Sequence, residues 1–171
     1  MVPDLDLQLQ VAIKALTDAV APAVDPSDKV AVEQLHLAIA TFSMVRDRLP
    51  FARRYARRQL EDAIALAHAL HSAAQADSTL AFAALDRTAA AARMALADVE
   101  ADTHDIEAAM DKLTDATVAI IAAAQNGPAS VAIDIAVLQA AAQPIERGRA
   151  WCLPSGFEPN PNAIRALADL V

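Results

Sequence analysis

The chain has 171 residues and a net charge of −8, a size that fits one domain able to bury its own core. Its single cysteine excludes an internal disulfide bond and a multi-cysteine metal cage. Its three glycines exclude the glycine-rich loops that hold cofactor phosphates. No stretch offers the roughly 20 mostly apolar residues that a membrane span needs.

Alanine supplies nearly half of the 56% of residues that are hydrophobic, whereas aromatic residues make up only 4%. Because alanine is the best helix former and loses no side-chain freedom on burial, the composition predicts closely packed helices. We expect an all-α fold, an antiparallel bundle of four to six helices in a single domain spanning residues 1–171. The acidic first segment does not resemble a signal peptide, so we expect a cytoplasmic protein. The excess of arginine over lysine suggests a GC-rich bacterial genome.

The first two expected helices, residues 5–20 and 26–49, each carry an apolar stripe at helical spacing. Asp25 is expected to cap the second helix, with Pro26 at its first position. Additional apolar residues lie off both stripes, which predicts a central helix or a subunit interface. The stripes are Leu5, Leu9, Ala12, Ile13, Leu16 and Val20, then Val32, Leu35, Ile39, Phe42, Val45 and Leu49; the additional residues are Leu7, Val11, Val30, Leu37 and Met44.

Pro50 disfavours helical geometry at Leu49 and therefore separates the second helix from the third, expected over residues 51–76. Because no glycine or asparagine marks a wider turn there, we expect a very short link, either a tight corner or a kink. Asp77 or Ser78 is expected to cap the fourth helix.

The fifth helix is expected to begin at a cap, Asp102 or Thr103, and to end at Asn126-Gly127-Pro128. There Gly127 would take the left-handed conformation and the proline would forbid continuation. The fourth and fifth helices both repeat apolar positions at alternating spacings of three and four, which is typical of an antiparallel bundle. Their faces are Phe82, Leu85, Ala89, Ala92, Leu96 and Val99, then Ile106, Met110, Leu113, Thr117, Ile120 and Ala124.

Residues 130–143 fit both a strand and a helix, and we expect a helix because a lone strand would have no partner. The periodicity then vanishes over residues 144–160, which predicts an irregular loop packed on the bundle, followed by a short helix from Asn160. Apolar side chains of this loop are expected to plug one end of the bundle, or to line a ligand cleft with its arginines. The possible lid comprises Arg147, Arg149, Trp151 and Cys152, and the plug Trp151, Leu153 and Phe157.

Six arginines lie between residues 46 and 58 of this otherwise acidic chain. Several are four residues apart, so like charges stack on one helix unless an anion compensates. The partner could be the chain's own acidic body, an acidic face of another subunit or protein, or a small anionic ligand. Nucleic acid is the weakest option, because the acidic remainder would repel a polyanion. The cluster comprises Arg46, Arg48, Arg53, Arg54, Arg57 and Arg58.

Three other motifs carry weak chemical signals. Glu33 and His36 have the Glu-x-x-His spacing of helical metal sites, but the required second motif is missing. His68 and His71 could share a metal, although their alanine-rich surroundings favour partly buried histidines that bond to the protein. Cys152 has no recognisable nucleophile motif around it. We therefore expect no metal and no cofactor, and the sequence leans against an enzyme.

Three classes of function remain open. The sequence favours a non-enzymatic protein that acts through protein–protein interaction or homo-oligomerisation, because its extra apolar stripes and its arginine cluster both need a partner. The alternative is a module that binds a small phosphate-containing or acyl-cofactor ligand at Arg46 to Arg58. An enzyme that uses a metal or Cys152 is the third class.

Overall fold

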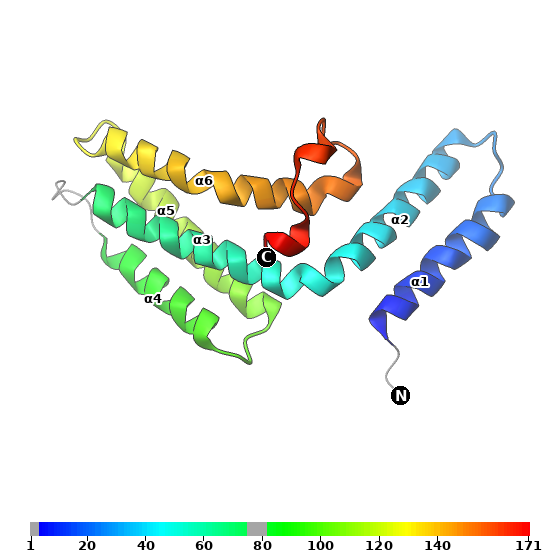
Figure 1. Ribbon diagram of the computed structural model, residues 1–171, viewed down its shortest axis with the longest axis horizontal. Coiled ribbons are helices and arrows are strands. Elements are labelled where there is room, and N and C mark those ends of the chain that lie inside the picture. Colours follow the sequence, from blue (N-terminus) through cyan, green and yellow to red (C-terminus); the bar gives the residue numbers. More distant parts are fainter. Residues whose placement is uncertain (1–3, 75–81) are drawn as a thin grey trace. The chain divides into compact units, whose positions relative to one another are not determined.

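The computed structural model describes residues 4–74 and 82–171 and is all-α, as predicted (Figure 1). It is 83% helical, with no strand in the part of the chain that it describes. The chain divides into two units, a hairpin unit (1–51 with 151–161) and a bundle unit (52–150 with 162–171). We describe each unit by itself, and a single domain spanning residues 1–171 stays a prediction.

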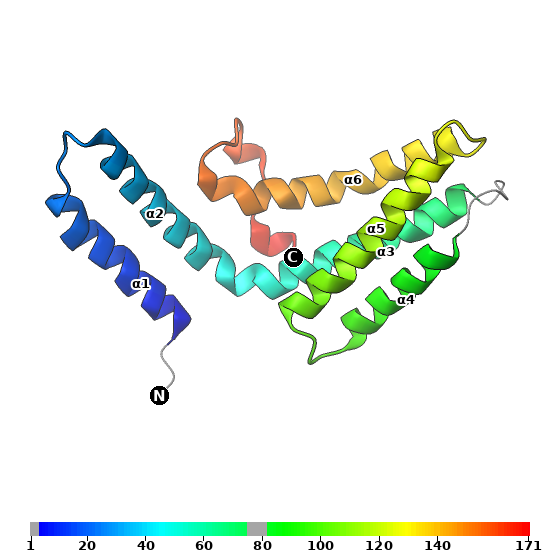
Figure 2. The same ribbon diagram turned by 180° about the vertical axis from the view of Figure 1, so that it is seen from behind.

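The hairpin unit is built on two antiparallel helices, α1 (Leu5–Ala15) and α2 (Lys29–Arg48), which lie side by side in both views (Figures 1 and 2). Asp4 caps α1 by accepting a hydrogen bond from the backbone N–H of Asp6, at 3.1 Å. After α1 the chain continues through a π turn (Leu16–Val20) and a 3-10 turn (Ala21–Ala23).

The cap of α2 is Asp28, and the prediction that Asp25 caps this helix is wrong. The Asp28 carboxylate accepts a hydrogen bond from the Ala31 N–H at 3.0 Å. Asp25 instead bonds to the backbone N–H and the hydroxyl of Ser27, at 2.9 and 2.7 Å. Both aspartates suit a helix start, and the turn closed by Asp25 delays the first helical residue to Lys29.

The link after α2 is a single 3-10 turn, Leu49–Phe51, which confirms the expected very short connection. Leu49 keeps helical angles, φ −50° and ψ −44°, although it precedes Pro50. The next helix, α3, spans Ala52–Ala73. The last two positions predicted for it, residues 75 and 76, lie outside the described residues.

The bundle unit packs three helices closely around one core: α3, α4 (Ala83–Ala97) and α5 (Thr103–Ala124). The predicted faces of the fourth and fifth helices are confirmed, with one exception. Val99 follows the end of α4 and is 77% exposed. The expected caps Asp77 and Ser78 lie outside the described residues. The largest fully buried side chains are Leu60, Leu70, Leu85, Ile106, Leu113 and Ile133.

Both ends of α5 are set by local side-chain chemistry. The predicted cap Asp102 forms a capping box with Asp105, each carboxylate accepting the other residue's backbone N–H, at 2.9 and 3.2 Å. These backbone hydrogen bonds lower the pKa of Asp102. At the other end Asn126, with φ 65°, takes the left-handed position that was predicted for Gly127. Asparagine tolerates this conformation better than other residues with a side chain.

Helix α6 spans Ser130–Cys152, which confirms the helix over 130–143 but shows that the predicted loop is wrong from 144 to 152. Pro144 removes one helical hydrogen bond without ending the helix, and Arg147 and Ala150 are buried beyond it. After Cys152 come 3-10 turns at Leu153–Ser155, Pro161–Ala163 and Leu167–Asp169. The last two stand where a short helix was expected, because so short a segment nucleates an α-helix poorly.

Candidate functional site

The hairpin unit has no buried side chain among residues 4–51. Two helices share a single seam, so every side chain of α1 and α2 keeps at least one open side. The seam itself is a shallow groove whose lining is almost entirely apolar. It is lined by Leu5, Gln8, Leu9, Ala12, Val45 and Leu49.

Nine large apolar side chains of the hairpin unit are exposed, with exposed fractions between 38% and 69%. They include residues of the main stripes and most of the additional apolar positions. Hence both the main stripes and the additional apolar positions contribute exposed side chains on these helices. The nine are Leu5, Leu7, Val11, Val20, Val30, Leu37, Phe42, Val45 and Leu49.

The charged side chains of the hairpin unit are partly paired among themselves. Arg46 donates from Nε and Nη2 to the two carboxylate oxygens of Asp6, at 2.7 and 3.1 Å, and so joins α2 to α1. This hydrogen bonding lowers the pKa of Asp6 and raises that of Arg46. Lys14 pairs with Asp18 at 2.5 Å within the first helical segment. These pairs leave the apolar side chains as the dominant feature of the hairpin surface.

The structure divides the predicted arginine cluster between the two units. Arg46 and Arg48 belong to the hairpin unit, where Arg48 Nε donates to the Trp151 carbonyl at 2.9 Å. Arg53, Arg54, Arg57 and Arg58 belong to the bundle unit. The six arginines are therefore described as two groups, and their role as an anion or partner patch stays a prediction.

Two bundle-unit arginines donate to the chain's own backbone at the end of α4. Arg53 Nη2 lies 2.6 Å from the Val99 carbonyl oxygen and 2.9 Å from that of Ala101. Arg57 Nη2 lies 2.6 Å from the Leu96 carbonyl oxygen. Leu96 lies in the last turn of α4, where carbonyls lack intrahelical partners and carry partial negative charge, which suits a cation. Val99 and Ala101 lie in the link between α4 and α5. Here the negative groups opposite the arginines are backbone carbonyls.

The possible lid residues lie on α6 rather than in a loop, and they too are divided between the units. Arg147 and Arg149 belong to the bundle unit, and Trp151 and Cys152 to the hairpin unit. Cys152 is an exposed free thiol. Phe157 is 90% exposed and belongs to the hairpin unit, so its role as a plug of the bundle stays a prediction.

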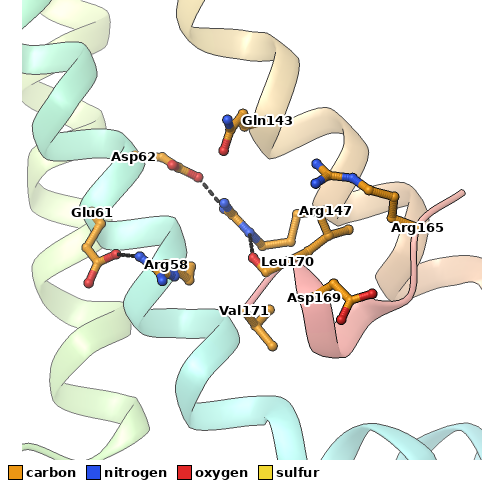
Figure 3. Close-up of a pocket in the computed structure, with 9 residues that line it drawn as sticks. All are labelled: Arg58, Glu61, Asp62, Gln143, Arg147, Arg165, Asp169, Leu170 and Val171. Carbon is orange, nitrogen blue, oxygen red and sulfur yellow. Dashed lines mark hydrogen bonds and ion pairs between the residues drawn. The ribbon is translucent and has the colours of Figure 1, made fainter.

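Arg147 lines a polar cavity of about 260 Å3 in the bundle unit (Figure 3). It is only 4% exposed, pairs with Asp62 on α3, and donates from Nε to the Leu170 carbonyl at 2.9 Å. Arg58 pairs with Glu61 at 2.6 Å on the same wall. Three arginines and three acidic residues line the cavity, so it offers no net charge to an ion.

The histidine motifs do not assemble a metal centre. His68 Nε2 lies 2.6 Å from Arg93 Nη2, and His71 Nδ1 lies 3.3 Å from Asp86, so each bonds to α4 as expected. Both are exposed, however, and not partly buried. His36 is also exposed, on α2. Among the residues that the structure describes, no three histidine, cysteine or acidic side chains are grouped as metal ligands would be.

Comparisons with known protein families, curated proteins and solved structures find no match to this chain. Within residues 4–74 and 82–171, no helix has the length and apolar character that crossing a membrane requires. Sequence reasoning also missed two cavities of the bundle unit, the polar one around Arg147 and an apolar one between α3, α5 and α6. Their only sequence signal was the unusual mixture of alanine, proline and arginine in the second half of α6.

Proposed function

We propose that this protein acts by self-association, and that the hairpin unit is the surface through which two copies meet. The observation that carries this proposal is the absence of any buried side chain in residues 4–51, together with nine exposed large apolar side chains. A helix that is apolar on more than one side needs neighbours on more than one side. Two antiparallel hairpins supply four helices, which can enclose a shared core.

The amount of exposed apolar surface agrees with a dimer interface. The nine side chains are about half exposed on average. At roughly 60–120 Å2 of apolar surface per fully exposed side chain, they offer on the order of 400 Å2. A standard interface covers about 800 Å2 per partner, about 65% of it apolar in homodimers. The hairpin therefore supplies most of the apolar surface that a homodimer needs.

The distribution of charge favours a second copy as the partner. The carboxylates of Asp28 and Glu33 outnumber Lys29 near the start of α2, and Arg46 and Arg48 outnumber Asp47 at its end. A two-fold axis that places two α2 helices antiparallel brings the acidic start of one beside the basic end of the other. Arg46 already pairs with Asp6 and Arg48 donates to the Trp151 carbonyl, so contacts with a second copy would add to these bonds. The alternative is a small anionic ligand on the arginine cluster, two of whose members, Arg53 and Arg57, already donate to backbone carbonyls.

Sedimentation velocity across a range of protein concentrations tests the proposal. We expect a dimer that dissociates on dilution, with weaker association at high salt because the charge pairs are screened. The double variant Val30→Glu plus Leu37→Glu should weaken dimerisation on the order of 100-fold, since charges would enter an apolar interface. Both side chains are more than half exposed, so the substitutions should not unfold the chain.

A matched control places the same charges elsewhere. Met94 on α4 and Val118 on α5 are 74% and 57% exposed, like Val30 and Leu37, but belong to the bundle unit. Met94→Glu plus Val118→Glu should leave dimerisation unchanged. A wild-type chain that stays monomeric at about 100 μM, or a control that dissociates as readily as the hairpin variant, would contradict the proposal.

A further inference from the structure

A second cavity, of about 320 Å3, lies in the bundle unit between α3, α5 and α6. This volume is at the lower end of the range for small-molecule sites. Most of the residues that each helix contributes are three or four apart and so line one face. The walls are mainly apolar and include Leu66, Met110 and Val137.

The cavity exists because the middle of α6 carries small side chains. Ile133 and Ala136 near its start are buried, as are Arg147 and Ala150 near its end. Between them, the residues that line the cavity are Val137, Ala140, Ala141 and Pro144, which are only partly buried. Alanines at these positions leave unfilled the space that larger apolar residues would occupy.

The cavity wall holds a buried hydroxyl group without a hydrogen-bond partner. Thr117 is 6% exposed, and its hydroxyl makes no hydrogen bond to any residue that the structure describes. Elsewhere in the chain Thr41 and Thr88 bond back to the carbonyl four residues earlier, at 2.8 and 3.0 Å. A buried donor without a partner is costly, so an unpaired Thr117 hydroxyl favours a ligand that completes it.

Helix α6 contributes a potential acceptor to the lining of the cavity. Ala140 and Pro144 both line the cavity. In a regular helix the N–H of residue 144 would bond to the Ala140 carbonyl, but proline has no N–H to donate. The Ala140 carbonyl therefore lacks the hydrogen bond that it would accept in a regular helix. The cavity thus combines a hydroxyl that can donate with a backbone oxygen that can accept.

The charged groups at the edge of this cavity neutralise each other. Asp62 and Arg147 line both this cavity and the polar one, and they pair with each other (Figure 3). Arg147 also donates to the Leu170 carbonyl. A ligand in the apolar cavity therefore meets a paired guanidinium and a paired carboxylate, and it needs no charge of its own.

We propose that the bundle unit binds a small neutral ligand in this cavity, an apolar molecule that carries one hydroxyl group. The apolar body lies among Leu66, Met110 and Val137, and the hydroxyl accepts from Thr117 and donates to the Ala140 carbonyl. One hydroxyl can do both, whereas a hydrocarbon can do neither. A carboxylate would enter an apolar site without an unpaired cation to meet it. This binding site is independent of self-association through the hairpin unit.

Three probes that share the naphthalene ring system distinguish a hydrocarbon, a neutral hydroxyl compound and a carboxylate as the ligand: naphthalene, 2-naphthol and 2-naphthoate. Each is titrated into the full chain while backbone amide chemical shifts are recorded by NMR. We expect saturable shifts at residues that line the cavity on all three helices. The 2-naphthol should bind about ten- to hundred-fold more tightly than naphthalene, at roughly three- to ten-fold for each of its two net hydrogen bonds. The 2-naphthoate should bind most weakly.

Two substitutions test the assigned residues. Thr117→Val keeps the shape of the side chain and removes the hydroxyl, so it should reduce the preference for 2-naphthol over naphthalene, leaving only the contribution of the Ala140 carbonyl. Ala141→Phe should fill the cavity and abolish binding of both, whereas Ala132→Phe, on the exposed face of the same helix, should not. Circular dichroism verifies folding, and Ala140→Leu serves as a smaller filling substitution if Ala141→Phe unfolds.

Four results would overturn the proposal. They are the absence of saturable shifts with the neutral probes, an unchanged preference in folded Thr117→Val, tight binding to a cavity-filled variant, and tightest binding of 2-naphthoate. The last result would transfer support to an anionic ligand. None of these outcomes depends on whether the chain dimerises.

Discussion

The hairpin unit and the bundle unit share one apolar pattern, yet only one of them has a core. In both, apolar residues recur every three or four positions along the helices, although α3, α4 and α5 are richer in alanine than α1 and α2. In the bundle unit this pattern leaves Leu60, Leu85 and Leu113 at most 1% exposed. In residues 4–51 it buries no side chain. An apolar stripe therefore predicts which side of a helix needs covering, but not which molecule covers it.

The difference follows from the number of helices that share a core. Three helices enclose a space in which α3, α4 and α5 each meet two others. Two helices, α1 and α2, meet along one line and leave their remaining surfaces open. The bundle unit is therefore stabilised by its own core, whereas the hairpin unit should gain stability on association with a second copy.

Truncating one leucine in each unit should give the largest contrast. Leu113→Ala removes a fully buried side chain of α5 and should lower the free energy of unfolding by about 2–5 kcal/mol. Leu37→Ala, on a half-exposed residue of α2, should change it by less than about 0.5 kcal/mol in dilute monomer. Urea unfolding followed by circular dichroism measures both. Equal losses in the two variants would show that the hairpin unit has a core of its own.

Thr117 carries a buried hydroxyl without a hydrogen-bond partner, and Thr117→Val should stabilise the bundle unit. The substitution removes a buried hydroxyl that lacks a partner, so the free energy of unfolding of the ligand-free chain should rise by roughly 1–2 kcal/mol. Thr88→Val is the control, because that hydroxyl bonds to the carbonyls of Ala84 and Leu85. Thermal unfolding measures both. A clear loss of stability in Thr117→Val would mean that its hydroxyl is satisfied in the free protein.

The fold class and the core faces could be predicted from the sequence because they depend on local periodicity. The positions of Ile106, Leu113 and Ile120 follow from spacing alone, and Asp102 was one of the two caps expected for α5, although its capping box with Asp105 was not predicted. The exact start of α2 could not be predicted, since Asp25 and Asp28 are chemically equal candidates. Nor could the continuation of α6 through Pro144, which rests on burial of Arg147 and Ala150 by distant segments.

The candidate sites were less predictable, because they depend on contacts between residues far apart in the chain. Six arginines in thirteen residues suggested one patch, but Arg53 and Arg57 donate to carbonyls about forty residues away. The partnerless hydroxyl of Thr117 had no sequence signal at all, since the same position fits the apolar face of α5. A missing hydrogen-bond partner can be recognised only when the neighbours of the side chain are known.

Arg57 tests whether the arginines stabilise the bundle unit through the end of α4. Arg57→Met keeps the helix propensity and the apolar stem but removes the hydrogen bond to the Leu96 carbonyl. The free energy of unfolding should fall by about 0.5–1 kcal/mol. Arg87→Met is the control, since Arg87 is exposed on α4 and no hydrogen bond or ion pair joins it to the described residues. A loss no larger than that of the control would favour a role for Arg57 in binding instead.

The smallest expected effect concerns the ion pair between Arg46 and Asp6, which joins the two helices of the hairpin unit. Its hydrogen bonds place the pKa of Asp6 below the ordinary value of 3.8. A depressed folded-state pKa stabilises the folded chain at pH values above the unfolded pKa. That contribution is lost as the pH falls through the folded pKa. Because both side chains are solvent-exposed, the change in stability should be slight.

NMR titration of the Asp6 carboxyl group measures this directly, in the wild type and in Arg46→Met. The variant should return the pKa of Asp6 toward its ordinary value, and Lys14→Met, which breaks a pair within one helical segment, should not. If Asp6 titrates identically in the wild type and in Arg46→Met, α1 and α2 are not held in this register by the pair. The hairpin would then owe its alignment to apolar contacts alone, and its open apolar surface would be the stronger reason to expect a second copy.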